Sequence, residues 1–297
     1  MGVGLSETRR GLEDLRRALA RVAGEAAGFL RDRFGQPELL EVRVRHGEDY
    51  GMEIDVEAED YIKELLRAEG LGGAVLGEEE GFRRLGDGDL LFIIDPLDGS
   101  KNYACQIPWN AVSIAAAPYR EEGPPRLTDI LAGAIAPVQR HPVYSFARGL
   151  GLYEGGRRLT ALRKPPAAMI LTYTETPEQA RLLQAYLRLS GRRSIRSLGS
   201  ASLEILWAGL GRVEAFMDVR GRLRPVDIAA AIWAAREAGA YVAVTDTNQP
   251  VTGLGRVGFI AVTAYRDAWE RLRRALLESG LGDPADHLLA GTPASRA

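Results

Sequence analysis

The sequence predicts an α+β half over residues 1–159, an α/β half over residues 160–280 and a peripheral tail over residues 281–297. Three observations lead to this prediction. In the first half, two helical patterns accompany a series of short apolar runs separated by turns, which is typical of a sheet flanked by helices. In the second half, strand and helix patterns alternate, which is typical of an α/β fold. The tail is rich in Pro, Gly and Ala and is expected to fray.

The composition excludes several classes of protein. With 297 residues, of which 46% are hydrophobic, the chain can bury a large core. Its 38 basic and 40 acidic residues give a net charge of −2, so we expect neither a nucleic-acid nor a membrane partner. Cys105 is the only cysteine, which excludes an internal disulfide and fits a reducing compartment. There is no signal-peptide pattern and no run of about 18 apolar residues, so we expect a cytoplasmic protein.

The first half begins with a helix that is predicted to start at Ser6, a residue type that caps helices, and to end near residue 35. A weak strand pattern follows over residues 39–44. The polar, glycine-containing segment 46–52 is expected to be a mobile loop. Helical periodicity returns over residues 55–67 and predicts a second helix.

The remaining elements are short. In the first half, strands are predicted at residues 74–76, 90–94, 111–117, 130–136, 142–147 and 151–153. In the second half, strands are predicted at residues 169–173, 194–198, 213–218, 241–245 and 259–263. Helices alternate with them at residues 177–189, 200–210, 225–238 and 267–279.

Two carboxylates, Asp95 and Asp98, follow the apolar run 90–94. The proline between them cannot continue a strand ladder, so both acids should lie where the strand opens into a loop. Carboxylate oxygens are ligands that Mg²⁺ prefers. If a short helix starts at Gly99 and Ser100, its free amide groups favour an anion beside that metal. Ordinary turn chemistry is the alternative explanation of this stretch.

Four further acids lie where a strand is predicted to end or a helix to begin. Glu78 and Glu79 follow a short strand, as Asp95 does, and two neighbouring strands that end together would bring these carboxylates to one place. A solvated charged turn is the alternative for the glutamates. Asp55 and Asp227 each lie in the first turn of a helix, where an acid can reach a metal or only favour the helix dipole.

These acids lie in four short motifs. Residues 95–100 read D-P-L-D-G-S, residues 77–79 read G-E-E, residues 227–230 read D-I-A-A, and Asp49 and Asp55 form a D-x₅-D element. In this order and spacing, they resemble the inositol monophosphatase and fructose-1,6-bisphosphatase superfamily over about residues 5 to 280.

Two segments, 54–59 and 218–224, resemble the archaeal branch of that superfamily, whose members hydrolyse both inositol 1-phosphate and fructose 1,6-bisphosphate. The sequence departs from the wider family at three positions. Val226 stands before Asp227 where many members have tryptophan, a departure that the archaeal branch shares. Ser100 and Met52 each stand where threonine is common, and Ser100 keeps the hydroxyl.

The resemblance implies a layered α/β/α/β/α sandwich of the sugar phosphatase type, with the site at the junction of the two halves. It implies a phosphatase that takes a small phosphorylated substrate and uses two to three Mg²⁺ ions, with Mn²⁺ as an alternative ion. It also implies a homodimer or a tetramer, and a lid formed by residues 36–51.

Carried over by position, the resemblance implies a set of metal ligands. Glu78, Asp95 and the carbonyl of Leu97 would hold one ion. Asp95, Asp98 and Asp227 would hold a second ion. Such an arrangement is typical of phosphoryl transfer assisted by two metals.

The same resemblance implies the catalytic residues. Glu79 would help Glu78 to hold a third ion near Asp55. Asp55 and the hydroxyl of Ser100 would position the attacking water, and the amides of Gly99 and Ser100 would bind the phosphate.

Substrate contacts are expected from Asp98, Gly99, Ser100, Arg196, Ala201 and Arg222. Arginine suits a sugar phosphate because its planar fork is always charged, although simple solvation is the alternative for any surface arginine. Two alternative functions stay open. One is a 3′-phosphoadenosine 5′-phosphate phosphatase of the same fold, and the other is a catalytically silent phosphosugar-binding protein.

Overall fold

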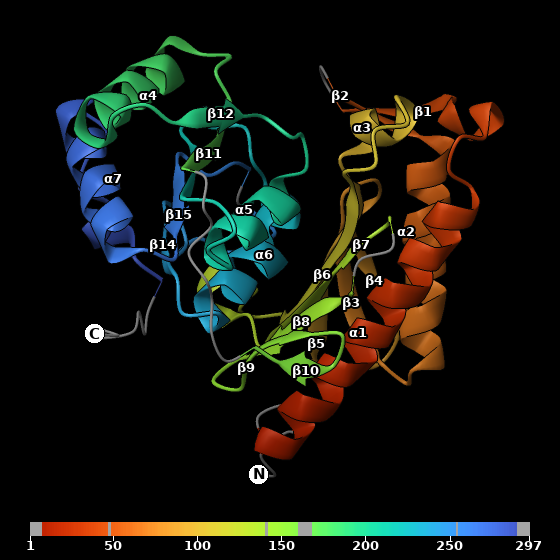
Figure 1. The fold of residues 1–297 in the computed structure, drawn as a ribbon. Coiled ribbons are helices and arrows are strands. Elements are labelled where there is room, and N and C mark those ends of the chain that lie inside the picture. Colours follow the sequence, from red (N-terminus) through yellow and green to blue (C-terminus); the bar gives the residue numbers. More distant parts are fainter. Residues whose placement is uncertain (1–7, 47–48, 140–141, 160–167, 254, 290–297) are drawn as a thin grey trace.

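The computed structural model describes residues 8–46, 49–139, 142–159, 168–253 and 255–289, with the backbone only for residues 37, 38, 42–46, 49 and 50. Five layers succeed one another in the order α/β/α/β/α (Figure 1). The layered sandwich that the resemblance implied is therefore confirmed. Within the described ranges, no helix is both long and apolar enough to cross a bilayer.

The first sheet has eight strands in the order β10-β9-β8-β7-β6-β5-β3-β4. Its strands are β3 (Gly73–Gly77), β4 (Gly81–Arg84), β5 (Leu90–Asp98), β6 (Ala111–Pro118), β7 (Ala132–Pro137), β8 (Tyr144–Ala147), β9 (Gly151–Glu154) and β10 (Arg157–Arg158). Only the pair β3 and β5 is parallel, and the other neighbours are antiparallel. The central strand β5 is buried along its whole length, as its apolar run predicts.

The second sheet has five strands in the order β12-β11-β13-β15-β14. Its strands are β11 (Met169–Thr172), β12 (Ser194–Arg196), β13 (Ala215–Asp218), β14 (Tyr241–Val244) and β15 (Ile260–Thr263). Strand β11 runs parallel to both β12 and β13, whereas β15 runs antiparallel to β13 and β14. The change of sheet falls between β10 and β11, and residues 160–167, where the second half is expected to begin, lie outside the described residues.

Helices form the other three layers. One pair, α1 (Arg9–Asp32) and α2 (Glu53–Ala68), covers the outer face of the first sheet; a second pair, α5 (Ala201–Gly209) and α6 (Pro225–Glu237), lies between the sheets; and a third pair, α4 (Pro177–Ser190) and α7 (Arg266–Glu278), covers the outer face of the second sheet (Figure 1). Shorter helical turns are η2 (Pro37–Leu40), α3 (Ser100–Ala104), η3 (Leu127–Asp129) and η4 (Pro284–His287).

The position of each helix follows from its sequence. The first helix is amphipathic and turns residues such as Leu19, Val22 and Leu30 to the sheet. Its N-cap is Thr8, whose hydroxyl accepts a hydrogen bond from the amide of Gly11 at 3.0 Å, whereas the expected cap Ser6 lies outside the described residues. Helix α6 is apolar around most of its surface, as suits a helix that is buried between two sheets.

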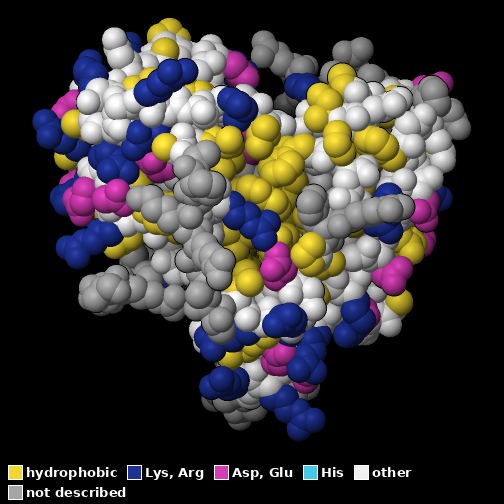
Figure 2. All heavy atoms as spheres, in the orientation of Figure 1, with side chains coloured by type: hydrophobic (Ala, Val, Ile, Leu, Met, Phe, Trp, Pro, Cys, Tyr) yellow, Lys and Arg dark blue, Asp and Glu magenta, His cyan; other side chains and the backbone are white. Residues whose placement is uncertain are grey.

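Small residues let the two central helices pack closely. A Cβ atom added at Gly209 of α5 would lie 2.4 Å from the Cβ of Ala235 in α6, which is closer than carbon atoms can approach. This close packing joins α5 and α6 into one helical layer of the second half. In the orientation of Figure 1, Figure 2 shows hydrophobic side chains gathered along the seam between the halves, with Lys and Arg scattered around it.

Two expectations are corrected by the backbone. The segment 46–52, expected to be a mobile loop, contributes strand β2 (Asp49–Met52), which pairs with β1 (Val42–His46) because the antiparallel ladder satisfies the backbone groups of both segments. The lid role of residues 36–51 stays a prediction. In the tail, Leu289 is buried and its amide donates to the carbonyl of Val242 at 3.0 Å, so this part of the tail packs against the second sheet rather than fraying. Residues 290–297 of the predicted tail lie outside the described residues.

Candidate active site

A pocket of about 180 Å³ lies where the two halves meet. Every site residue that the sequence predicted lines it, except Arg196 and Arg222. The first half contributes Asp55, Glu78, Glu79, Asp95, Leu97, Asp98, Gly99, Ser100 and Lys101, and the second half contributes Tyr173, Gly199, Ala201, Leu223, Arg224 and Asp227. The pocket wall is therefore completed only when the halves are packed together.

Two neighbouring strands bring the first acids to one edge of the sheet. Strands β3 and β5 are parallel, and Gly77 at the end of β3 lies opposite Ile94. Glu78 and Asp95 are the next residues on their strands, so their carboxylates leave the sheet side by side, as the sequence predicted. The pairing of β5 with β6 then shifts register between Asp95 and Asp98, a bulge that separates these two acids from a regular ladder.

The three acids Glu78, Asp95 and Asp227 each offer a carboxylate oxygen, and these oxygens all lie within 4.8 Å of one another. Asp95 is 2% exposed, and its burial, followed by the charges of Glu78, Asp98 and Asp227, raises the pKa of Asp95 well above its usual value. Buried carboxylates that repel one another are stabilised by a cation between them. Hard oxygen donors in this number fit Mg²⁺ or Mn²⁺.

Asp98 has a different environment. Its two oxygens accept hydrogen bonds from the start of α5: from the Ser200 hydroxyl at 2.6 Å, from the Ala201 amide at 3.0 Å, and from both the amide, at 2.7 Å, and the hydroxyl of Ser202. Burial raises the pKa of Asp98, and these hydrogen bonds oppose the rise. Asp98 thus joins the two halves, and its role as a ligand of a second ion stays a prediction.

Asp55 caps a helix and lies in the pocket, and its role at a metal or in catalysis stays a prediction. Its Oδ2 accepts a hydrogen bond from the amide of Met52 at 2.7 Å, which caps α2, and the residue also lines the pocket. It is 3% exposed, and burial, opposed by that hydrogen bond, together with the charges of Glu78 and Glu79 raises the pKa of Asp55 well above its usual value. The side chain of Asp49, the other acid of its motif, lies outside the described residues.

Residues of α2 support the turn that contains Glu78 and Glu79. The amide of Glu79 donates to Oε2 of Glu59 at 2.9 Å, and the ammonium of Lys63 lies 3.0 Å from the other oxygen of Glu59. Burial and the charges of Glu78 and Glu59 raise the pKa of Glu79 to about 7. This support from Glu59 and Lys63 was missed by the sequence reasoning, although both lie on the helix that begins beside Asp55.

At the predicted phosphate cradle, the backbone conformation and the close packing both favour glycine at position 99. Gly99 has φ = 90°, a left-handed conformation that favours glycine, and it is the N-cap of α3. A Cβ atom there would lie 3.0 Å from the carbonyl oxygen of Trp109 and 3.1 Å from that of Gly199. A larger residue would push apart the two halves of the chain at this point. The role of the Gly99 and Ser100 amides in binding phosphate stays a prediction.

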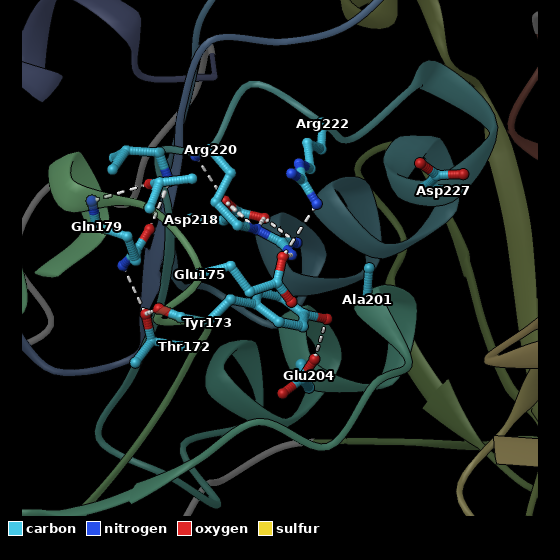
Figure 3. Close-up of polar contacts among 12 residues, drawn as sticks. Thr172, Tyr173, Glu175, Gln179, Ala201, Glu204, Asp218, Arg220, Arg222 and Asp227 are labelled. Atoms are coloured by element: carbon cyan, nitrogen blue, oxygen red, sulfur yellow. Dashed lines mark hydrogen bonds and ion pairs between the residues drawn. The ribbon is translucent and has the colours of Figure 1, made fainter. Parts of the chain in front are cut away.

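A polar network surrounds Tyr173, which lines the pocket from the second half (Figure 3). The hydroxyl of Tyr173 donates to Glu204 at 2.5 Å, and the guanidinium of Arg220 lies 3.6 Å from the centre of the Tyr173 ring. Arg220 is itself held by Asp218 at 2.8 Å. Sequence reasoning missed Tyr173 as a pocket residue and Glu204 and Arg220 as its partners, although Arg220 belongs to the segment that resembles the archaeal branch.

Two predicted substrate residues lie outside the pocket. The guanidinium of Arg222 is 52% exposed and pairs with Glu175 at 3.2 Å, and Figure 3 shows it directed to that residue rather than to Asp227. Arg196 is exposed, and its guanidinium donates to the carbonyl of Ile195 at 2.7 Å. Both lie at strand or loop positions whose side chains point to solvent, so contact with a substrate stays a prediction for them.

A third arginine, Arg224, reaches the acids instead. It is the N-cap of α6, its guanidinium contacts Glu78, and the same nitrogen lies 3.3 Å from Oδ1 of Asp227. Sequence reasoning missed Arg224, although a signal was present. The arginine directly precedes Pro225 and lies three residues before Asp227, at the predicted start of a helix.

The buried acid Glu204 leads to a prediction about pH. It is 0% exposed, and its burial raises its pKa from 4.5 to about 7. The unfolded chain therefore ionises this group at lower pH than the folded chain does, so stability falls as pH rises from about 4.5 to about 7. Between pH 5 and pH 8, we expect the wild type to lose about 2.5 kcal/mol more unfolding free energy than Glu204→Gln, measured by urea denaturation. Parallel pH profiles of the two proteins would contradict this.

Comparisons with known proteins agree with this geometry. Residues 12–279 match the model of the inositol monophosphatase family. An inositol-1-monophosphatase of Aeropyrum pernix is 39% identical over 280 residues, which cover 91% of this chain and 98% of that protein. A fructose-1,6-bisphosphatase/inositol-1-monophosphatase of Methanothermobacter thermautotrophicus is 30% identical over 199 residues, which cover 64% of this chain and 69% of that protein.

Solved structures show the same fold. The crystal structure of the extragenic suppressor protein suhB from Bartonella henselae has a TM-score of 0.70 against this chain and is 25% identical to it. The match covers 88% of this chain and 98% of that one.

Proposed function

The chain belongs to the inositol monophosphatase family, and we propose that it is a Mg²⁺-dependent phosphomonoesterase that hydrolyses inositol 1-phosphate and fructose 1,6-bisphosphate. The observation that carries this proposal is the meeting of Glu78, Asp95 and Asp227 within 4.8 Å at the junction of the halves. The two substrates are suggested by the archaeal relatives, one of which is named for both activities.

The acids would hold the divalent ions. Glu78, Asp95 and Asp227 fit one ion through their clustered oxygens, and Asp98 and Glu79 are the further candidates for additional ions. A bound divalent ion supplies positive charge beside the phosphoryl group and lowers the pKa of a neighbouring water. In the absence of that charge, the buried carboxylates would repel a phosphate dianion.

The remaining groups of the pocket would bind and orient the reactants. Oδ2 of Asp55 is held by the Met52 amide, so Oδ1 is the oxygen that would accept a hydrogen bond from the attacking water. The Ser100 hydroxyl would hold the same water. The amides of Gly99 and Ser100 would bind the phosphate, and the organic part of the substrate would lie against Ala201 and Tyr173.

A panel of phosphate-release assays tests this proposal. With Mg²⁺, we expect phosphate release from inositol 1-phosphate and from fructose 1,6-bisphosphate, and we expect addition of EDTA to abolish both. The reason is that no divalent ion then supplies positive charge at the phosphoryl group. A third substrate, 3′-phosphoadenosine 5′-phosphate, is the control for the alternative nucleotide phosphatase.

The outcomes separate the candidates. Release from the nucleotide alone would replace the proposed substrates. Binding of a phosphosugar without any Mg²⁺-dependent release would favour the silent binding protein. Release that persists in EDTA would contradict the role given to the acid cluster.

A further inference from the structure

Arg224 places a fixed positive charge among the acids of the pocket. Its guanidinium contacts Oε1 of Glu78, and the same nitrogen lies 3.3 Å from Oδ1 of Asp227. Glu78 and Asp227 are two of the three acids whose oxygens cluster within 4.8 Å. The arginine therefore bridges, across the junction of the halves, two of the carboxylates that would bind a divalent ion.

The backbone ties this arginine to its place. Arg224 is the N-cap of α6, and its amide donates to Oδ2 of Asp227 at 2.7 Å. Pro225 is the first residue of the helix, and its ring restricts the backbone there. The side chain of Arg224 therefore starts from a rigid position beside the acid cluster. Both oxygens of Asp227 thus have Arg224 as a partner, one through its backbone and the other through its side chain.

The contacts of Arg224 overlap those expected of a metal. The side chains of Arg224 and Glu78 are 29% and 24% exposed, so the pair is only partly screened by water. A divalent ion held by Glu78 and Asp227 must share these two carboxylates with the guanidinium or displace it. The ion and the guanidinium are both positive, so they repel each other. Arg224 therefore acts against metal binding and in favour of the packed acid cluster.

We propose that Arg224 is an internal cation that competes with the divalent metal for Glu78 and Asp227, and so sets the metal concentration at which the pocket fills. This proposal rests on the proposed function only in taking the acid cluster as a metal site. It predicts that removal of the charge tightens metal binding, whereas an arginine that merely supports the pocket would weaken metal binding when removed.

The test is Mn²⁺ binding to the full-length protein, measured as free Mn²⁺ by electron paramagnetic resonance. We expect Arg224→Gln to bind Mn²⁺ at least about tenfold more tightly than the wild type, a difference of about 1.4 kcal/mol. Arg224→Lys keeps the charge without the planar fork and should lie between them. Without metal, Arg224→Gln should melt at a lower temperature than the wild type because its acids are uncompensated.

Arg212→Gln is the matched control. Arg212 pairs with Glu154 at 2.8 Å with side chains 37% and 29% exposed, close to the values for the Arg224 pair, and it does not line the pocket. Its loss should leave Mn²⁺ affinity unchanged. Equal or weaker Mn²⁺ binding by folded Arg224→Gln and Arg224→Lys, while the wild type binds Mn²⁺, would overturn the role of Arg224 and spare the proposed function. Absence of Mn²⁺ binding by the wild type would overturn both.

Discussion

Asp95→Asn is expected to lower phosphatase activity at least about 1,000-fold, because it removes a charge that helps to stabilise the transition state. Asp95 forms the acid cluster with Glu78 and Asp227, and it is 2% exposed within β5. An amide of the same size carries no charge, so it would hold a divalent ion far less well. The measurement is kcat for phosphate release at saturating Mg²⁺.

The same variant should not lose stability when metal is removed with EDTA. Burial and the neighbouring acids raise the pKa of Asp95, which means that its ionised form is unfavourable in the folded protein. Asparagine removes that repulsion, so the melting temperature of Asp95→Asn should equal or exceed that of the wild type. A loss of activity combined with a retained melting temperature separates a role at the reaction centre from a role in folding.

Asp89→Asn is the matched control for this experiment. Asp89 is exposed and directly precedes the same strand, β5 (Leu90–Asp98), but it does not line the pocket. Activity and melting temperature of this variant should both be unchanged. Activity of Asp95→Asn close to that of the wild type would remove Asp95 from the proposed site.

Local patterns explain why part of the site could be predicted from sequence. An apolar run that ends at an acid places that acid at a sheet edge, and this holds for both Glu78 and Asp95 because β3 and β5 are parallel neighbours. The short apolar runs and the alternating second half likewise predicted most strands and helices. Such inferences succeed because side-chain burial and backbone propensity are local properties of the chain.

Interactions between distant segments could not be predicted in the same way. Nothing near Asp98 in the sequence shows that Ser200 and Ser202 donate hydrogen bonds to it. Which arginine reaches the acids, Arg222 or Arg224, also depends on tertiary structure. Arg222 pairs with Glu175, whereas Arg224 pairs with Glu78. The pairing of the segment 46–52 into a hairpin depends on a partner strand whose pattern was weak.

Asp98→Asn is expected to destabilise the fold, in contrast to Asp95→Asn three residues before it. The carboxylate of Asp98 accepts hydrogen bonds from the amides of Ala201 and Ser202, which are at the buried start of α5. An asparagine side chain has one oxygen instead of two. Its amide nitrogen would face one of these backbone donors, which would then have no acceptor. A buried donor without an acceptor costs about 1–3 kcal/mol, so we expect the unfolding free energy to fall by about 2–3 kcal/mol.

The measurement is urea denaturation in EDTA, so that bound metal cannot offset the loss of stability. Ser202→Ala is measured under the same conditions for comparison. That variant removes one hydroxyl donor and leaves both backbone hydrogen bonds, so its loss should be about 1 kcal/mol. If Asp98→Asn were as stable as the wild type, Asp98 would not hold the halves together. Opposite changes in stability for Asp95→Asn and Asp98→Asn would show that the motif combines two tasks: Asp95 concentrates negative charge in the pocket, and Asp98 fastens the pocket's second wall to the first.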